Sequence, residues 1–529
     1  MKKSIVLLLA GIMTISLAGC SLLNVENLVA NIGNGSETEV SEKETESEES
    51  EQKSEDGSDV SEEASEENTV VSITEQEKNG YVIYSERRNL YHAEDGTTYA
   101  EGYCDSLFFD EELSGDYSLL AEAVKKYSDE TGKRIDEEYQ LLADSSKEMN
   151  MGILSVCCGM TVRRADDTVF SVLEYYSQYS GGAHPYSGYS GFSVDVQTGK
   201  VLTWSDVFTD DGTLAAAIAS EIEEKYAEDL DYFFEEDIEG SIQSYLDLAD
   251  ESVLEIIVLR DSVEVMFNPY TIAPYALGCV TVELTAEEYP SLLNSKYMDK
   301  ETKDYVEGIP MNWEFCLDAN GDGTEERYYL WDMASEDCLD ALNITLNDVN
   351  YEYDRHGYRY TPYLVSKNGT YYLYVDISAE NDSHQVDVFR LTGDDIVSEG
   401  QFYGFIGGIS NPDSFYVTQR VDVLSTYNVV ALHYVGEDGI PQAFDEHYYA
   451  KTDVQITSTV ELTGKDVNGE DVSFPAGTVF RFSGTNKVDY LDLISADGVW
   501  ARFEVNVSWP MTINGVDAES CFEILYFAG

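Results

Sequence analysis

An acidic loop in the second half of this 529-residue chain carries its clearest pattern of ligand-type side chains. Asp318, Asn320 and Asp322 occupy alternate positions, and Gly323 follows directly after them. Ca²⁺ takes several oxygen ligands at short range, and a glycine at the sixth position permits the sharp turn that gathers them. This spacing predicts a calcium site. Its predicted ligands are Asp318, Asn320, Asp322, the carbonyl of Thr324, and Glu326.

Two features distinguish this loop from an EF-hand. The twelfth position is Tyr329, where an EF-hand has a bidentate glutamate, and residues 313–317 before the loop have the pattern of a strand. The loop is similar instead to the DxDxDG loops of extracellular β-rich repeat proteins. The alternative is a hairpin turn without metal, because an acid-rich chain produces such spacing by chance. Residues 466–471 lack the glycine at the sixth position, and there we predict a turn.

Two other segments combine glycines, prolines and aromatic residues. Glycines allow positive φ or a close backbone approach, prolines stiffen extended chain, and tyrosine packs flat with its hydroxyl outward. His184 is a candidate base, ligand or pH switch, but we favour a histidine that anchors its loop by a hydrogen bond to the backbone. The candidate binding residues are Gly181, Gly182, His184 and Pro185 in the first segment, and Asn268, Pro269, Tyr270, Pro274 and Tyr275 in the second.

These segments carry a resemblance to a known family. The motif GGAHP at 181–185, the stretch TGKVLTWSDVF at 198–208 and FNPYTIAPYALG at 267–278 resemble the extracellular DUF3298 family, which usually follows a DUF4163-like portion. That pair is found in the ectodomain of the RsiV anti-sigma factor, which recognises lysozyme, and at the N-terminus of some peptidoglycan deacetylases. The resemblance covers most of residues 79–298 and implies an extracellular binding domain. No RsiV-type transmembrane segment and no deacetylase HxxxH motif accompany it.

Catalytic signatures are missing from the sequence. It contains no HExxH, GxSxG, GxxxxGK[ST] or GxGxxG motif. Carboxylates are too abundant for any two to be assigned as a glycosidase pair. We therefore expect no catalytic residue. The alternative, a cell-wall-modifying hydrolase, would rely on His184.

The N-terminus has the pattern of a lipoprotein signal. Lys2 and Lys3 precede a mostly apolar run from Ser4 to Leu17, which is too short for a spanning helix. The sequence LAGC at 17–20 resembles the bacterial lipobox. The resemblance implies that residues 1–19 are a signal peptide and that a lipid on Cys20 holds the chain at the extracytoplasmic face of the cell membrane. The alternative is an ordinary secretory signal.

Charge restricts the partners of this protein. The formal net charge is −71, from 31 Lys and Arg against 102 Asp and Glu, so the chain repels nucleic acid and anionic membrane surfaces. Residues 20–78 include a serine-rich acidic run without aromatic residues, and we predict a disordered tether there. The remaining sequence is also acidic, which favours cationic partners.

The elements that position these residues predict an α+β fold followed by β-rich domains. Residues 79–298 show strand and helix patterns in separate runs, with predicted helices at 117–127, 214–226 and 242–248. Residues 305–450 are tyrosine-rich and short-stranded, with a predicted hairpin at 363–377 that turns at Asn368-Gly369. A second hairpin is predicted around 472–482. Residues 451–529 are predicted to form a small all-β domain, either an SH3-like barrel or a sandwich.

Seven cysteines remain after Cys20, and we read most of them as small buried side chains, with Cys316 and Cys338 as a candidate disulfide. The leading functional prediction is a surface lipoprotein that acts as a non-enzymatic binding module, with lysozyme or another basic wall-active protein as the candidate partner. The second is a cell-wall hydrolase. The third is a calcium-stabilised structural or adhesive surface protein.

Overall fold

The computed structural model describes residues 80–94, 96–111, 114–209, 212–248, 254–299, 304–334, 339–379 and 383–527. The predicted signal peptide at 1–19, the lipid attachment at Cys20 and the tether at 20–78 lie outside these residues and stay predictions. Strands make up 49% of the structure and helices 16%, so the protein is β-rich. None of the helices in the described ranges is long and apolar enough to cross a bilayer.

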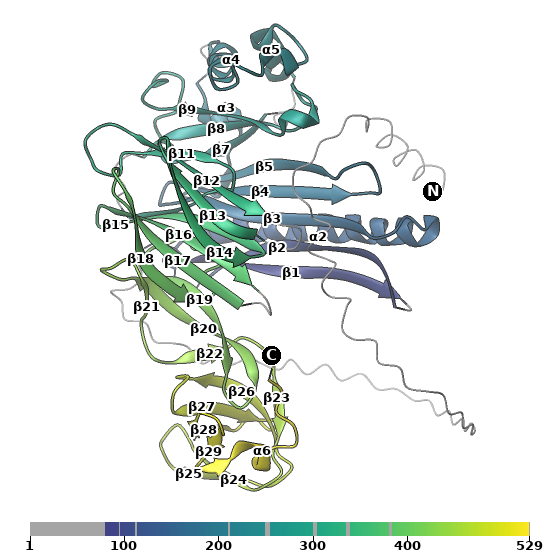
Figure 1. The fold of residues 1–529 in the computed structure, drawn as a ribbon, viewed down its shortest axis with the longest axis vertical. Coiled ribbons are helices and arrows are strands. Elements are labelled where there is room, and N and C mark those ends of the chain that lie inside the picture. The colour runs from purple at the N-terminus through teal and green to yellow at the C-terminus, as the bar shows by residue number, and fades with distance from the viewer. Residues whose placement is uncertain are drawn as a thin grey trace.

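The first sheet contains six strands in chain order (Figure 1). Neighbouring strands are antiparallel except β2 and β3, which are parallel and are connected by the long helix α2 (Ser118–Met149). The strands are β1 (Ile83–Glu94), β2 (Thr97–Phe109), β3 (Leu154–Ala165), β4 (Val169–Tyr179), β5 (Tyr186–Asp195) and β6 (Lys200–Val201).

Helix α2 is longer than the sequence pattern predicted. The prediction ended at residue 127 because polar side chains interrupt the apolar stripe. Two of these polar residues are buried by hydrogen bonds to the sheet: Ser128 Oγ accepts from the Leu107 N–H, and Thr131 Oγ1 donates to Glu174. Beyond them the stripe resumes, and the helix ends at Asn150 in the left-handed conformation (φ 52°). The apolar residues buried against the sheet are Leu120, Val124, Ile135, Tyr139 and Leu142.

A second unit packs helices on a three-stranded antiparallel sheet. Its helices bury the stripe that begins at Leu214 and Ile218, together with Ile242, against the sheet. The predicted helices at 214–226 and 242–248 are confirmed with shifted ends. The elements are α3 (Trp204–Val207), α4 (Leu214–Lys225), η3 (Leu230–Tyr232), α5 (Ile238–Leu246), β7 (Glu255–Val258), β8 (Ser262–Phe267), η5 (Tyr275–Leu277) and β9 (Val280–Thr285).

Two antiparallel sheets follow and share one core. Tyr328 and Leu330 of the four-stranded sheet pack with Leu373 and Phe389 of the five-stranded sheet. The four-stranded sheet has β11 (Glu314–Leu317), β12 (Glu326–Ala334), β13 (Leu339–Leu346) and β14 (Val349–Gly357). The five-stranded sheet has β10 (Tyr305–Gly308), β15 (Arg359–Lys367), β16 (Thr370–Ala379), β17 (Ser383–Leu391) and β18 (Ile396–Tyr403).

The hairpin predicted at 363–377 is confirmed. Strands β15 and β16 pair from Lys367↔Thr370 outward. Asn368 and Gly369 have φ of 52° and 76°, which is the pair of positive φ angles that a type I′ turn requires. Cys316 has a free thiol, and Cys338 lies outside the described residues, so the candidate disulfide stays a prediction.

The C-terminal strands form one large sheet that runs across residue 450. Strand β22 pairs with β20 on one side and with β26 on the other, so residues 415–450 are hydrogen-bonded to the predicted terminal domain. Figure 1 shows this end of the chain at the opposite end of the molecule from α4 and α5. The predicted boundary at 450/451 and the SH3-like barrel stay predictions. The strands are β19 (Phe415–Asp422), β20 (Thr426–Val435), β21 (Pro441–Ala443), β22 (Tyr448–Ala450), β23 (Gln455–Thr457), β24 (Leu462–Lys465), β25 (Asp471–Phe474), β26 (Val479–Thr485), β27 (Tyr490–Ser495), β28 (Trp500–Asn506), β29 (Thr512–Ile513) and β30 (Val516–Asp517), followed by α6 (Ala518–Cys521).

The second predicted hairpin is wrong. Residues 472–482 do contain two strands, but β25 pairs with β24, while β26 pairs with β22, β23 and β27. The turn that closes β24 onto β25 lies at 466–470, where the Asp466 N–H donates to the Glu470 carbonyl. The turn predicted for 466–471 is therefore confirmed, and it is this turn that sets the pairing of β25.

Candidate functional site

Asn268 joins the two motif segments through its side chain. Its Oδ1 accepts a hydrogen bond from the Tyr189 N–H at 2.7 Å, and its Nδ2 donates to the Tyr189 carbonyl at 2.8 Å. The carboxamide therefore pairs with β5 as a neighbouring strand would. Gly188 permits this approach, because a Cβ on it would lie 2.9 Å from Asn268 Oδ1.

Aromatic rings from the two segments stack on one another. His184 and Tyr275 have ring centroids 4.1 Å apart, and Tyr270 and Tyr275 are 5.9 Å apart. His184 Nδ1 donates to the Pro185 carbonyl at 2.8 Å, and its Nε2 is buried with no hydrogen-bond partner in the described part of the chain. The prediction of a histidine that anchors its loop is confirmed by this backbone hydrogen bond.

The remaining motif residues shape the two loops. Gly181 has φ +89°, as predicted for this motif, whereas Gly182 has no positive φ. Pro269 is buried, and Pro274 immediately precedes η5. Tyr270 has φ +72° and lies in a tight turn, in which its own N–H donates to the Ala273 carbonyl. The structure thus brings both segments to one end of β5.

A cleft of about 480 Å³ lies beside these motif loops, between α2 and the strands. Its lining combines tyrosines with charged groups. Its residues are Tyr127, Glu130, Thr131 and Arg134 of α2, Glu174 and Tyr176 of β4, Tyr186, Gly188, Tyr189 and Ser190 of β5, Glu255 of β7, and Asn268 of the second motif segment.

Glu174 is the most enclosed charged group of the cleft. Its side chain is 5% exposed and forms an ion pair with Arg134. Oε2 also accepts hydrogen bonds from the Tyr127 hydroxyl at 2.8 Å and from Thr131 Oγ1 at 3.3 Å. Because its oxygens have several donors, Glu174 is fully compensated and fixes α2 to β4.

Glu255 is compensated only in part. Its Oε2 accepts a hydrogen bond from the Gly191 N–H at 3.1 Å. Among the described residues, no cationic side chain forms an ion pair with Glu255 and no group donates to its Oε1. Burial raises the pKa of Glu255, the Gly191 hydrogen bond opposes this, and the charge of Glu174 raises the pKa further. A partly buried carboxylate without a counter-charge is a group that a cationic ligand would stabilise.

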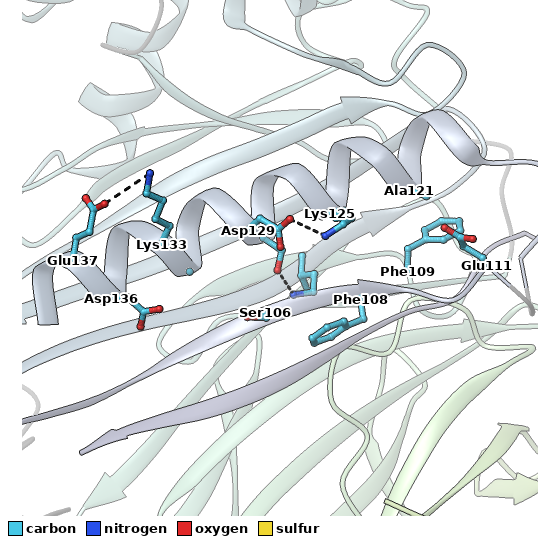
Figure 2. A pocket seen from close by; sticks show the side chains of 13 residues that line it. Ser106, Phe108, Phe109, Glu111, Ala121, Lys125, Asp129, Lys133, Asp136 and Glu137 are labelled. Carbon is cyan, nitrogen blue, oxygen red and sulfur yellow. Dashed lines mark hydrogen bonds and ion pairs between the residues drawn. The ribbon is translucent and has the colours of Figure 1, made fainter. Parts of the chain in front are cut away.

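A second hollow, of about 680 Å³, runs along α2 on its side toward β2 (Figure 2). It contains none of the motif residues, and five of its six charged side chains form ion pairs within the described part of the protein. These ion pairs are Lys125 with Asp129 at 2.8 Å, Lys133 with Glu137 at 3.9 Å, and Asp136 with Arg88 at 2.8 Å. We therefore place the candidate site at the cleft beside the motif loops.

The predicted calcium loop connects β11 to β12 and is closed by its own hydrogen bonds. Asp318 Oδ1 accepts from the Gly321 N–H at 2.7 Å, and its Oδ2 accepts from the Gly323 N–H at 2.9 Å. Glu326 accepts from the Asn320 side-chain amide at 3.0 Å. Within the described ranges, no three or more His, Cys, Asp or Glu side chains are grouped to hold a metal ion. These hydrogen bonds close the loop as a turn, and calcium binding stays a prediction.

Sequence reasoning missed the charged residues of the cleft. Two signals were visible. Glu174 is the only charged residue in the mostly apolar and aromatic stretch 169–176, where a carboxylate needs a partner. Glu255 is likewise the only charged residue of the otherwise apolar stretch 254–259. Arg134 gave no such signal, because it lies among polar residues in the sequence. Only the fold brings α2, β4 and β7 around one cleft.

Comparisons with known proteins identify one domain. Residues 205–287 match the family model described as "Protein of unknown function (DUF3298)", a range that includes the second motif segment and begins after the first. A DUF3298 family protein from Pseudomonas aeruginosa PAO1 is 16% identical, with a TM-score of 0.29 over 41% of this chain and 97% of its own. A member from Bacteroides fragilis NCTC 9343 is 17% identical, with a TM-score of 0.31 over 41% of this chain and 94% of its own. The comparison with curated proteins gives no match.

The DUF3298 domain predicted from the motifs is thus confirmed for residues 205–287. The DUF4163-like portion and the likeness to RsiV stay predictions.

Proposed function

We propose that this protein is a surface lipoprotein, held to the membrane by a lipid on Cys20, whose DUF3298-containing region is a non-enzymatic binding module for a basic protein of the envelope. Lysozyme is the first candidate partner, because the motif segments resemble the RsiV ectodomain. The formal net charge of −71 supports a cationic partner, since opposite charges speed association.

One observation carries this proposal: the motif loops and an acidic, tyrosine-lined cleft lie side by side. The loops expose Tyr270, a residue that is 37% accessible and whose backbone is fixed by a tight turn. The cleft offers Glu255 without a cationic partner among the described residues. Tyrosines are enriched among the residues that dominate a protein interface, and a carboxylate without a counter-charge favours a basic partner.

The placement of His184 supports binding over hydrolysis at this position. A general base has to reach the proton that it removes. Nδ1 of His184 donates a hydrogen bond to the Pro185 carbonyl, and Nε2 is buried. The ring therefore serves as a packing surface for Tyr275.

Calorimetric titration of the purified full chain with lysozyme tests the proposal. We expect binding at about 50 mM salt that weakens at about 200 mM, because screening reduces the attraction between opposite charges. Cytochrome c, another basic protein, is the control for binding by charge alone. No binding of lysozyme at low salt, or equal binding of both proteins, would remove lysozyme as the partner.

A substitution in the second motif segment refines this test. Asn tolerates positive φ, so Tyr270→Asn removes the ring with little backbone strain. We expect it to weaken lysozyme binding about tenfold, the loss typical of an aromatic interface residue. Tyr403→Asn removes a more accessible ring, on a residue that is 66% exposed, from β18, far from the motif in sequence, and is expected to leave the affinity unchanged. Equal affinities of both variants would contradict a role for the motif.

A further inference from the structure

We propose that the cleft between α2 and β5 takes a lysine side chain of the partner, with the ammonium group placed on Glu255. This inference rests on the proposed function and names the chemistry by which a basic partner is recognised. It is carried by the charges of the cleft, by its tyrosine walls and by the hydrogen bonds that Glu255 already makes.

The charges of the cleft leave one carboxylate for a ligand. The lining has three carboxylates, on Glu130, Glu174 and Glu255, and a single cation, on Arg134. Arg134 already forms an ion pair with Glu174, whose side chain is 5% exposed. Glu130 is exposed to solvent, whereas Glu255 is partly buried. Glu255 is therefore the group that gains most from a cation, because water compensates it least.

The walls of the cleft suit the rest of a lysine side chain. Tyr176, Tyr186 and Tyr189 line it, and Tyr186 remains 42% exposed at its edge. Aromatic faces attract an ammonium group and also cover the apolar stem that carries it. The Arg134 guanidinium already lies 5.5 Å from the Tyr176 ring centroid, so this surface accommodates a cation in the unbound protein.

The hydrogen bonds of Glu255 select lysine over arginine. Arginine binds a carboxylate best as a fork, with parallel hydrogen bonds to both oxygens. In Glu255, Oε2 already accepts from the Gly191 N–H at 3.1 Å, and Oε1 has no donor among the described residues. One available oxygen matches the single point charge of lysine.

The test compares peptide binding to the full chain and its variants by calorimetry in about 150 mM salt. The probes are trilysine, triarginine and Nε-acetylated trilysine. We expect trilysine to bind more tightly than triarginine and the acetylated peptide to bind least. Glu255→Gln keeps the acceptor for Gly191 and removes the charge, so it is expected to fold and to weaken trilysine binding about tenfold. Tyr186→Leu is expected to weaken it about threefold.

Glu137→Gln is the matched control, because it removes the same charge from the other side of α2, in the hollow of Figure 2. It is expected to leave trilysine affinity unchanged. Equal affinities for the Glu255→Gln and Glu137→Gln variants would overturn the inference, and so would equal binding of trilysine and its acetylated form. Lysozyme binding is measured with the same variants. If lysozyme fails to bind while trilysine depends on Glu255, the partner is wrong and the lysine site stands; if lysozyme binds both variants equally, the binding function stands and the lysine site is wrong.

Discussion

At the scale of single residues, Asn268 has the most specific role in the candidate site. Its carboxamide donates to and accepts from the backbone of Tyr189 at the same time. A side chain with one donor and one acceptor is required for this pairing, and Asp, which has the same size, supplies only acceptors. This explains why an asparagine stands at the start of the second motif segment.

Asn268→Asp is therefore expected to destabilise the protein by about 1–3 kcal/mol, because the Tyr189 carbonyl loses its donor and faces a carboxylate instead. The measurement is the free energy of unfolding from urea titration. Asn89→Asp, at an exposed position of β1, is expected to change stability by less than about 0.5 kcal/mol. If the Asn268→Asp variant is as stable as the Asn89→Asp variant, the role assigned to the carboxamide is contradicted.

His433 predicts a pH dependence of stability. The residue is 1% exposed, and burial lowers the pKa of its imidazole from 6.5 to about 4. Because the folded pKa lies below the unfolded one, the stabilisation by the neutral ring is complete above about pH 6.5 and is lost as the pH falls toward 4. We expect a loss of about 3 kcal/mol between pH 7 and pH 4.

His433→Gln is expected to remove this part of the pH dependence, although the variant starts from a lower stability. His356→Gln changes a histidine whose side chain is 70% exposed and is expected to leave the profile intact. The free energy of unfolding at pH 7 and pH 4 in the three proteins gives the answer. A His433→Gln profile as steep as that of the unsubstituted protein would refute the assignment.

At the scale of elements, the contact between the first sheet and the following β-rich region depends on a buried ion pair. Arg163 of β3 lies 2.9 Å from Glu264 of β8 and 3.1 Å from Glu307 of β10. The side chains of Arg163 and Glu264 are 4% and 5% exposed. Three strands from three sheets thus meet at one guanidinium. The ring of Trp313, just before β11, also packs edge-on against the Tyr189 ring, with the ring centroids 5.6 Å apart. The β-rich region therefore reaches the candidate site.

Arg163→Met is expected to destabilise the protein by about 3–5 kcal/mol, because two carboxylates stay buried without a counter-charge. Arg88→Met removes an ion pair whose partners are about half exposed and is expected to cost less than about 1 kcal/mol. Urea titration measures both. Adding Glu264→Gln to Arg163→Met is expected to recover part of the loss, and an equal cost for the two single variants would disprove this account.

The loop between β11 and β12 provides the calcium prediction. If the loop binds Ca²⁺ with the affinity typical of extracellular sites, about 10 mM Ca²⁺ stabilises the protein by about 1.4–2.7 kcal/mol. Thermal unfolding with and without calcium measures the effect, which Asp322→Ala is expected to abolish. Asp466→Ala, in the turn between β24 and β25, is the control. An unfolding midpoint that does not respond to calcium would leave the loop as the turn that its hydrogen bonds already form, and would count against a calcium-stabilised adhesive role.

At the scale of the whole molecule, the negative charge acts on stability as well as on partners. The chain has 102 acidic against 31 basic residues, and mutual repulsion between like charges opposes a compact state. Raising NaCl from about 20 to about 300 mM shortens the screening length from about 20 Å to about 6 Å. We expect the thermal midpoint, measured with a calcium chelator present, to rise. Choline chloride is expected to act equally, because the effect is one of screening, and a midpoint that falls with salt would contradict it.

Local sequence signals predicted much of the element pattern. The stripe from Leu214 predicted α4, and the Asn368-Gly369 pair predicted the β15–β16 hairpin, because periodicity and turn geometry are properties of neighbouring residues. The same reasoning ended α2 too early, since polar side chains such as Ser128 are buried there by partners from another element. It also paired β25 with the wrong strand, because strand pairing depends on residues far away in the sequence.

The acidity of this protein, its DUF3298 motifs and the residues that shape their loops can all be read from the amino-acid sequence alone. A glycine, a proline or an asparagine places local demands on the backbone that can be read from its neighbours. Three other features depend on the folded chain: Asn268 pairs with Tyr189, Glu174 has a counter-charge in Arg134, and Glu255 has none among the described residues. Whether a charge is compensated depends on groups that folding brings within a few ångströms, and these groups come from α2, β4, β5 and β7, which are far apart along the chain.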